Sequence, residues 1–157
     1  MPDRKTRFEI RQMCEKDLSA VAQIEQEIFS QPWSEQGFAN SLSQENTCYL
    51  VADMNGEIVG YCGFLQVLDE ADITNVAIKE KYRRLGAGRS LLEVLIKEGE
   101  KRGVTAFTLE VRESNVAALK LYQTLGFESA GIRKNFYDFP KENAVIMWKY
   151  DQRFPLG

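Results

Sequence analysis

Residues 71–111 constrain the fold most, because they read as a strand, a glycine-rich turn, a helix and a second strand. Residues 71–78 carry three β-branched apolar side chains, as expected of a strand. Four leucines and isoleucines share one face of a predicted helix over 88–102, and Gly103 ends that helix. Two strands joined by a helix pair in parallel through a right-handed crossover, so the sheet must contain one parallel pair.

The rest of the chain favours antiparallel strands around this unit. Further strands are predicted over 6–11, 47–54, 57–68, 104–111, 127–132 and 144–150, and helices over 15–29, from Ser34, and over 115–125. Asn55-Gly56 predicts a hairpin turn. This order predicts an α/β (α+β) fold, with a mixed, mostly antiparallel seven-stranded sheet flanked by about four helices. No linker or repeat divides residues 1–157, so we expect a single domain with a frayed tail at 151–157.

The chain has no histidine, which excludes Ser–His and Cys–His nucleophilic pairs and histidine metal sites. Cys14, Cys48 and Cys62 form no Cys-x-x-Cys pair, and each lies in a stretch that could bury it, so no metal is expected. The net charge of −3 argues against a nucleic-acid partner. No signal segment and no membrane-spanning apolar run is visible, so we expect a cytoplasmic protein without a membrane partner.

The turn KYRRLGAGRSLL, at 81–92, combines glycines with arginines. Backbone N–H groups at the start of a helix lack partners and lie at the positive end of the helix dipole. Glycines let a ligand approach the backbone, and arginines add forked donors that suit phosphate oxygens. The turn is therefore a candidate phosphate or pyrophosphate site. Its residues are Arg84, Leu85, Gly86, Ala87, Gly88 and Arg89.

The alternative interpretation of this turn is a tight loop with solvated arginines. Two other phosphate motifs fit less well. The dinucleotide fingerprint requires a third glycine, where this chain has Leu91. A P-loop requires Gly-Lys-Ser/Thr, which the chain lacks.

The pattern Arg-x-x-Gly-x-Gly at 83–88 resembles the acyl-CoA loop of the GCN5-related N-acetyltransferase (GNAT) family, and the predicted order of elements is also that of the family. QPWSEQGF, TLEVRESNVAALKLYQTLGF and RKNFYDFPKENAVIMWK resemble its RimI-type branch. Those bacterial enzymes acetylate the N-terminal α-amine of a small-subunit ribosomal protein, the eighteenth. The resemblance implies acetyl-CoA as co-substrate, with its pyrophosphate on the loop and its pantetheine arm along the backbone of Val76, Ala77 and Ile78.

Glu110 is the candidate general base. It lies in the strand FTLEVR, where the apolar residues share one face and Glu110 points to the other. A salt bridge with Arg112 or Arg133 is the structural alternative. In the family that the chain resembles, the matching glutamate takes the proton of the amine, directly or through water.

Tyr122 and Asn115 belong to the predicted helix over 115–125. By spacing alone, Tyr122 is a buried aromatic residue and Asn115 is an N-cap. The resemblance implies that the tyrosine also donates a proton to the departing coenzyme A sulfur, and that the asparagine also contacts the cofactor. An ordinary tyrosine, with a pKa of about 10, is protonated at neutral pH and needs no tuning to donate. Backbone N–H groups near Ala77 and Ile78 are the expected oxyanion donors.

The acceptor is expected to contact the segment 29–38 and a loop predicted at 135–143. Trp33 and Tyr137 are the candidate substrate-binding residues, although core packing is the better expectation for Phe29 and Trp33. The Asp-Phe-Pro-Lys sequence of the loop departs from the family pattern.

Three functions fit the sequence. The first is acetylation of a protein N-terminus, with a ribosomal protein as partner. The second is acetylation of another amine, such as lysine, a polyamine or an antibiotic. The third is an acyl-CoA-binding module without turnover. The presence of Glu110 and Tyr122 in one LEVR…LYxxLGF run favours the first.

Overall fold

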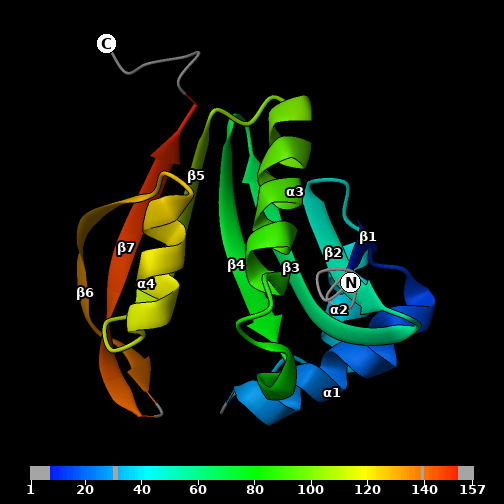
Figure 1. The fold of residues 1–157 in the computed structure, drawn as a ribbon. Helices are drawn as coiled ribbons and strands as arrows, with labels where there is room; N and C mark the ends of the chain where they lie inside the picture. Colours follow the sequence, from blue (N-terminus) through cyan, green and yellow to red (C-terminus); the bar gives the residue numbers. More distant parts are fainter. Residues whose placement is uncertain (1–7, 30–31, 139, 152–157) are drawn as a thin grey trace, which may run out of the picture.

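The computed structural model describes residues 8–29, 32–138 and 140–151 of the chain. Within these ranges seven strands form one sheet in the order β1-β2-β3-β4-β5-β7-β6, with four α-helices packed on it (Figure 1). The strands are β1 (Glu9–Gln12), β2 (Thr47–Met54), β3 (Glu57–Val67), β4 (Glu70–Ile78), β5 (Ala106–Arg112), β6 (Glu128–Asp138) and β7 (Lys141–Tyr150). The helices are α1 (Leu18–Ile28), α2 (Glu35–Leu42), α3 (Ala87–Lys101) and α4 (Val116–Thr124), with short 3₁₀ turns η2 (Glu15–Asp17) and η3 (Glu80–Tyr82). The predicted fold class is confirmed.

Neighbouring strands run antiparallel except β4 and β5, which pair in parallel. This pair is the one that the strand–helix–strand segment required, since α3 connects the two strands. Asn55 and Gly56 turn the chain between β2 and β3, with positive φ angles of 55° and 93°. Positive φ at both central residues is the requirement of the type I′ hairpin turn that the Asn-Gly pair predicted.

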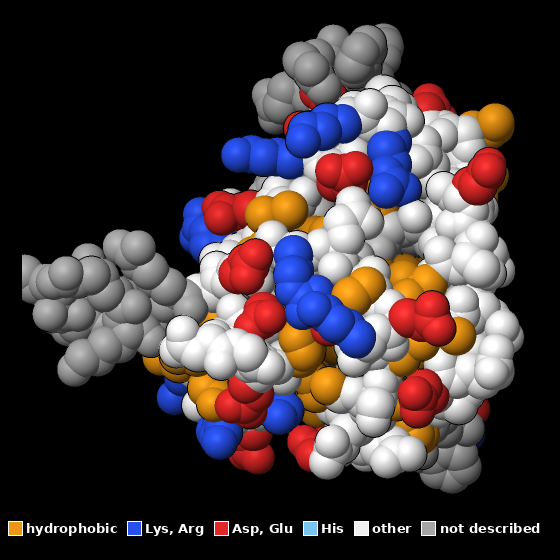
Figure 2. All heavy atoms as spheres, turned by 90° about the vertical axis from the view of Figure 1, so that its right-hand side faces the viewer, with side chains coloured by type: hydrophobic (Ala, Val, Ile, Leu, Met, Phe, Trp, Pro, Cys, Tyr) orange, Lys and Arg blue, Asp and Glu red, His pale blue; other side chains and the backbone are white. Residues whose placement is uncertain are grey.

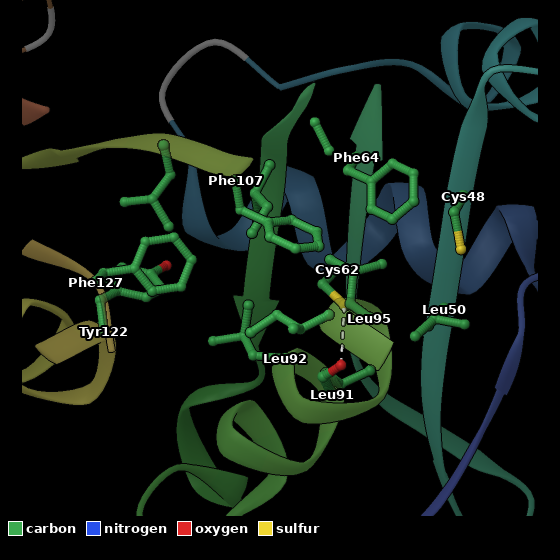
Figure 3. Packing of buried hydrophobic residues seen from close by; sticks show 14 of the residues in the cluster. Cys48, Leu50, Cys62, Phe64, Leu91, Leu92, Leu95, Phe107, Tyr122 and Phe127 are labelled. Atoms are coloured by element: carbon green, nitrogen blue, oxygen red, sulfur yellow. Dashed lines mark hydrogen bonds between the residues drawn. The ribbon is translucent and has the colours of Figure 1, made fainter. Parts of the chain in front are cut away.

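Two apolar cores lie on opposite faces of the sheet. Helices α3 and α4 cover one face (Figure 1), and Figure 3 shows Leu91, Leu92 and Leu95 of α3 packed towards Phe64 and Phe107 of the sheet. Helices α1 and α2 cover the other face, over β2, β3 and β4. The second core is built from residues of those helices and strands, namely Leu18, Val21, Ile24, Phe38, Tyr49, Val51, Tyr61 and Ala77. The apolar faces predicted for α1 and α3 are therefore buried.

Strand β4 contains a bulge at Thr74. Gly63 of β3 pairs with Asn75 and Phe64 pairs with Ile73, so Thr74 has no partner in the β3–β4 ladder. Before the bulge, Ala71 and Ile73 face the core under α3 and α4. After it, Val76 and Ile78 pack against that core, while Ala77 enters the core under α1 and α2. The extra residue thus reverses the alternation of faces along β4.

The last hairpin is longer than the sequence predicted. Strand β6 was expected to end at residue 132, with a loop over 135–143, but pairing resumes at Tyr137 opposite Glu142 and Asp138 opposite Lys141. The ladder is irregular between Arg133 and Tyr137, and Asn135 has a φ of 54°. This irregularity interrupts the two-residue alternation by which strands are recognised in a sequence. The loop prediction is therefore wrong for most of its length.

Charged side chains of both signs are mixed over the face of the molecule at the β1 edge (Figure 2). Arg11 bonds Asp17 at 2.8 Å and Asp53 at 3.2 Å there, and these three residues line a hollow of about 460 Å³. Cys48 and Cys62 are buried as expected, but Cys14 is exposed, against the prediction. In the described part of the chain, no helix has the length and apolarity needed to cross a membrane.

Candidate active site

Strands β4 and β5 separate at the point where the predicted site begins. Their pairing is limited to Glu70 with Ala106, Ala71 with Phe107 and Asp72 with Thr108. Beyond these pairs, β5 pairs on its other side with β7, and β4 pairs on its other side with β3. The carboxyl-terminal half of β4 therefore has one edge that no strand of the described chain covers.

The backbone groups of Val76 and Ile78 point to this uncovered edge. The Lys79 N–H donates to the Val59 carbonyl at 2.8 Å, which fixes the phase of the antiparallel ladder between β3 and β4. In such a ladder alternate residues bond the partner strand, so Ala77 bonds towards Tyr61, and Val76 and Ile78 face away. Of the three predicted pantetheine residues, Val76 and Ile78 direct backbone groups to this edge, whereas Ala77, also an expected oxyanion donor, bonds towards β3, against the prediction. The Ile78 carbonyl accepts a bond from Arg83 Nε at 3.1 Å.

The predicted phosphate loop forms the entrance to α3. Gly86 is the N-cap residue, with a φ of 91°, and no side chain caps the helix. The first intrahelical bond runs from the Ser90 N–H to the Gly86 carbonyl at 3.0 Å. The N–H groups of the first turn, at residues 87–89, therefore have no carbonyl of the preceding turn to bond. Arg84 also has a positive φ, of 66°, and is exposed.

The donor set of this loop suits a diphosphate. It combines unpaired N–H groups at the positive end of a helix with exposed arginines at 84 and 89. A side chain built at Gly88 would meet only Leu121 at 3.6 Å and Ile78 at 3.8 Å, so the backbone there is open to a ligand. Arg89 is partly neutralised by Glu93, whose carboxylate lies 3.2 Å from its Nε. Ala87 is buried and Leu85 is exposed, but both side chains are apolar and offer nothing to an anion.

Glu110 lies on β5, on the face opposite the core that contains Phe107, Leu109 and Val111. Its carboxylate pairs with Arg133 of β6, with 3.3 Å between Oε2 and Nε. Of the two salt bridges that the sequence left open, this is the one formed. Arg112 instead pairs with Glu142 at 3.2 Å.

Burial raises the pKa of Glu110, and the charge of Asp72 raises it further, while Arg133 opposes both effects. Asp72 of β4 pairs with Thr108 of β5, in the last pair that these two strands form. Thr108 lies two residues before Glu110 in β5, so Asp72 and Glu110 are on the same face of the sheet. Burial also raises the pKa of Asp72. A raised carboxyl pKa makes a stronger base, since the ionised form then binds a proton more tightly.

Tyr122 is buried on α4, with 7% of its surface exposed, and its ring packs against Phe127 with 5.7 Å between centroids (Figure 3). Its hydroxyl donates to no other described residue, yet every fully enclosed side-chain polar atom of the described chain has a partner. The hydroxyl oxygen therefore reaches accessible space. Burial raises the Tyr122 pKa, which keeps the hydroxyl protonated.

Asn115 caps α4, and its side chain accepts a bond from the Ala118 N–H at 3.1 Å. The predicted N-cap is confirmed. Next to it, the Glu142 carboxylate accepts bonds from the Ser114 N–H at 2.6 Å and from Arg112 at 3.2 Å. These contacts join the β5–α4 connection to the β6–β7 hairpin.

Tyr137 lies in β6 rather than in the expected loop, half-buried, with the Arg112 guanidinium 4.2 Å from its ring centroid. Trp33 and Phe29 were expected in the core, but 37% and 38% of their surfaces are exposed. Burial raises the pKa of Tyr137, and the charge of Glu110 acts in the same direction. Arg112 lies two residues beyond Glu110 on β5, so its contact with the Tyr137 ring places Tyr137 on the Glu110 side of the sheet.

Sequence reasoning missed two acidic residues of this region. Asp72 shares a face with Glu110, and the ADIT sequence around it carried an alternation that could have shown this. Glu25 is buried on α1, where the helical pattern predicts a solvent-facing charge, and no sequence signal marks it. Among the described residues no three Asp, Glu or Cys side chains group as a metal site would require.

Comparison with known proteins places this geometry in context. The acetyltransferase (GNAT) family profile matches residues 18–127. The chain is 44% identical over 133 residues to the [ribosomal protein bS18]-alanine N-acetyltransferase of Escherichia coli K12, covering 83% of this chain and 89% of that one. It is 39% identical over 139 residues to the protein of the same description from Haemophilus influenzae, covering 85% and 92%.

Solved structures agree with the sequence comparison. The crystal structure of the ribosomal-protein-S18-alanine N-acetyltransferase from Escherichia coli superposes with a TM-score of 0.83 at 39% identity, covering 96% of this chain and 100% of the other. Ard1 from Thermoplasma volcanium also gives a TM-score of 0.83, at 25% identity, covering 92% and 97%. The likeness therefore extends over the whole fold.

Proposed function

The chain belongs to the acetyltransferase (GNAT) family, and from this premise we propose that it transfers an acetyl group from acetyl-CoA to the N-terminal α-amine of a protein. The proposed acceptor is the N-terminal alanine of ribosomal protein bS18. The observation that carries this proposal is the near full-length similarity to enzymes described by that acceptor. A ribosomal acceptor would place the reaction in the cytoplasm.

In the proposed reaction, Glu110 takes a proton from the amine, directly or through water, so that the nitrogen lone pair can attack the acetyl carbonyl carbon. The N–H groups of Val76 and Ile78 face the uncovered edge of β4, where they can donate to the carbonyl oxygen as it gains charge. Tyr122 gives its hydroxyl proton to the sulfur as the carbon–sulfur bond breaks. The nitrogen loses its second proton as the amide forms, and this proton restores the Tyr122 hydroxyl through water, while the proton on Glu110 passes to the solvent.

The loop at 84–89 supports the coenzyme assignment by its donor set. Unpaired N–H groups and two exposed arginines suit the pyrophosphate of acetyl-CoA. The uncovered backbone at Val76 and Ile78 continues from that loop and suits an amide-containing arm. Asn115, already an N-cap, lies at the start of the helix that carries Tyr122.

The chemistry also favours an α-amine acceptor. An α-amine has a pKa near 8 and lysine one of about 10.4, so at neutral pH deprotonation costs roughly 1.4 kcal/mol for the first and 4.6 kcal/mol for the second. A single carboxylate, held partly by Arg133, has the lighter task with an N-terminus. The acidic residues Asp72 and Glu110 on the acceptor side are also compatible with a cationic ammonium group before deprotonation.

The test uses a peptide that begins with a free alanine and carries an internal lysine, with the same peptide blocked at its N-terminus as control. Each is incubated with enzyme and acetyl-CoA, and fragment mass spectrometry locates any acetyl group. We expect modification at the alanine amine and none in the blocked peptide. Acetylation at lysine only, or at small amines only, would favour another acceptor class. Coenzyme binding without any acetyl transfer would favour a binding module.

A further inference from the structure

A buried carboxylate outside the proposed transfer site has no part in the chemistry above. Glu25 of α1 is 3% exposed, and Tyr61 of β3 is fully buried beside it. One carboxylate oxygen accepts a hydrogen bond from the Tyr61 hydroxyl, and the other accepts one from the Trp33 backbone N–H at 3.1 Å. No lysine or arginine of the described residues pairs with Glu25. These two hydrogen bonds therefore offset the free-energy cost of burying the Glu25 carboxylate.

The Trp33 end of this network fixes the entry to α2. Ser34 is the N-cap residue of α2, and its hydroxyl accepts a bond from the Gly37 N–H at 3.1 Å. Trp33, one residue earlier, packs against Phe38 with 5.2 Å between ring centroids. This contact between the residue before the cap and the fourth helical residue is a hydrophobic staple, which sets the direction of the incoming chain. Glu25 adds a bond to the backbone at the same point.

The Tyr61 end of the network lies beside the strand that offers its backbone to the coenzyme. Tyr61 is the register partner of Ala77 in β4, between Val76 and Ile78. Phe38 also contacts Tyr61, edge to face, with 5.5 Å between centroids. The carboxylate therefore links the segment before α2 to β3, which is paired with β4. The uncovered edge of β4 borders the opening, by which we mean the region where β4 and β5 separate.

We propose that Glu25 is a positioning residue for the acceptor, because it holds the Trp33 backbone, and with it the exposed Trp33 indole, in a fixed place relative to Val76–Ile78. This proposal rests on the proposed function, in which the acceptor reaches the opening past the segment that contains Trp33. Phe38 covers only part of the indole, and 37% of the surface of Trp33 is exposed and available to a ligand.

The chemistry of the two partners explains why a carboxylate suits this position. Both the Trp33 N–H and the Tyr61 O–H are donors, and an ionised carboxylate can accept from both. A glutamine can accept from Trp33 through its oxygen and donate to the Tyr61 hydroxyl through its nitrogen, if the hydroxyl turns. A leucine can do neither, although it fills a similar volume. Glu25→Gln should therefore preserve the contacts with Trp33 and Tyr61, and Glu25→Leu should remove them.

The first test measures steady-state kinetics with a peptide that begins with alanine. For Glu25→Leu we expect the acceptor KM to rise about tenfold, because that is the effect of losing a hydrogen bond to a buried group. The KM for acetyl-CoA should stay within about twofold. Glu25→Gln should stay within about threefold of wild type in both. Tyr61→Phe is the matched control, because it breaks the same network but leaves the Trp33 bond, and its acceptor KM should stay within about threefold.

Two outcomes would overturn the proposal. One is an unchanged acceptor KM in Glu25→Leu, and the other is an equal rise in Tyr61→Phe, which would indicate a general loss of stability. If Glu25→Leu does not fold, Glu25→Asp takes its place, because the shorter side chain keeps the charge but cannot span from the Tyr61 hydroxyl to the Trp33 N–H. Its acceptor KM should be about fivefold above that of Glu25→Gln, and equal values would refute the proposal.

Amide hydrogen exchange tests the same contact without an acceptor, and so separates this proposal from the proposed function. Exchange in peptides spanning residues 33–42 should be faster in Glu25→Leu than in wild type, and unchanged in Tyr61→Phe. If the wild-type enzyme acetylates no N-terminus, the proposed function fails on its own test. If exchange over 33–42 is the same in all three proteins, Glu25 does not hold this segment and its positioning role is refuted.

Discussion

The two strands that border the opening contribute different kinds of groups. β4 and the turn after it contribute backbone, through Val76, Ile78 and the glycines at 86 and 88. β5 and the helix after it contribute side chains, Glu110 and Tyr122. A backbone group is retained in most substitutions that keep the conformation of the chain, whereas a functional side-chain group is lost when one of its atoms is replaced. Changes on the β5 side should therefore alter the rate of transfer, and changes on the β4 side should alter coenzyme affinity.

The strongest test of the β5 side is Glu110→Gln. Turnover should fall at least tenfold, within the 10²–10⁴ range typical of a general base, while the KM for acetyl-CoA stays nearly unchanged. Steady-state kinetics with both substrates measures this. Glu113→Gln is the matched control, because Glu113 is an exposed glutamate three residues along and should be silent. Wild-type turnover in Glu110→Gln would remove the base assignment.

Tyr122→Phe should give the next largest effect, a slowing of transfer of about tenfold or more. The hydroxyl bonds no other described residue, so its removal should leave the free energy of unfolding within about 0.5 kcal/mol of wild type. Kinetics and denaturant unfolding on the same preparation check both halves. Wild-type activity would mean that the hydroxyl takes no part in proton transfer.

The β4 side is tested by Gly88→Ala. The new methyl group makes ordinary contacts with Leu121 and Ile78, and alanine is favoured over glycine within a helix by about 1 kcal/mol. We expect equal or higher stability together with a severalfold higher KM for acetyl-CoA, because the methyl group adds bulk at the backbone where we propose that the pyrophosphate binds. Gly86→Ala separates the two effects, since the φ of 91° makes it cost stability by about 1 kcal/mol. An unchanged KM in Gly88→Ala would contradict pyrophosphate binding at this turn.

The smallest expected effect is a shift in the pH dependence of kcat/KM. Glu110 must be ionised to act as a base, so activity should fall as the pH drops through its pKa. Asp72 raises that pKa, so Asp72→Asn should move the acidic limb of the profile to lower pH. Arg133 lowers it, so Arg133→Met should move the limb to higher pH. The groups facing Glu110 are Asp72 on β4 and Arg133 and Tyr137 on β6. Shifts in the same direction would contradict this electrostatic account.

Much of the fold followed from the sequence, because local signals and burial agreed. Thr47–Met54 is a short apolar run that ends at an Asn-Gly turn, and it forms β2 with the predicted bounds. The prediction of the end of β6 was wrong, because the irregularity near Asn135 breaks the alternation that marks a strand. Pairing with β7 then determines the conformation, and that is a tertiary contact that one segment of sequence does not contain.

The site was predictable where one element defines it. The turn at 84–89 and the N-cap Asn115 were found because helix starts have local signatures. Arg133 was only one of two candidates for Glu110, since strand order decides which cation is near. Glu25 was not found, because its partners come from two other elements, at Trp33 and Tyr61.

The unpaired Thr74 has a consequence for how this chain can change in length. In a regular strand, one inserted residue would exchange the faces of all residues after it. The bulge takes up this extra residue, because Phe64 and Gly63, which are adjacent in β3, pair with Ile73 and Asn75 on either side of Thr74. Loss of Thr74 would therefore leave a regular ladder in which Val76 and Ile78 still face α3 and Ala77 still faces α1. A deletion of one residue should be tolerated at Thr74 more readily than elsewhere in β4, where it would exchange the two faces of the strand.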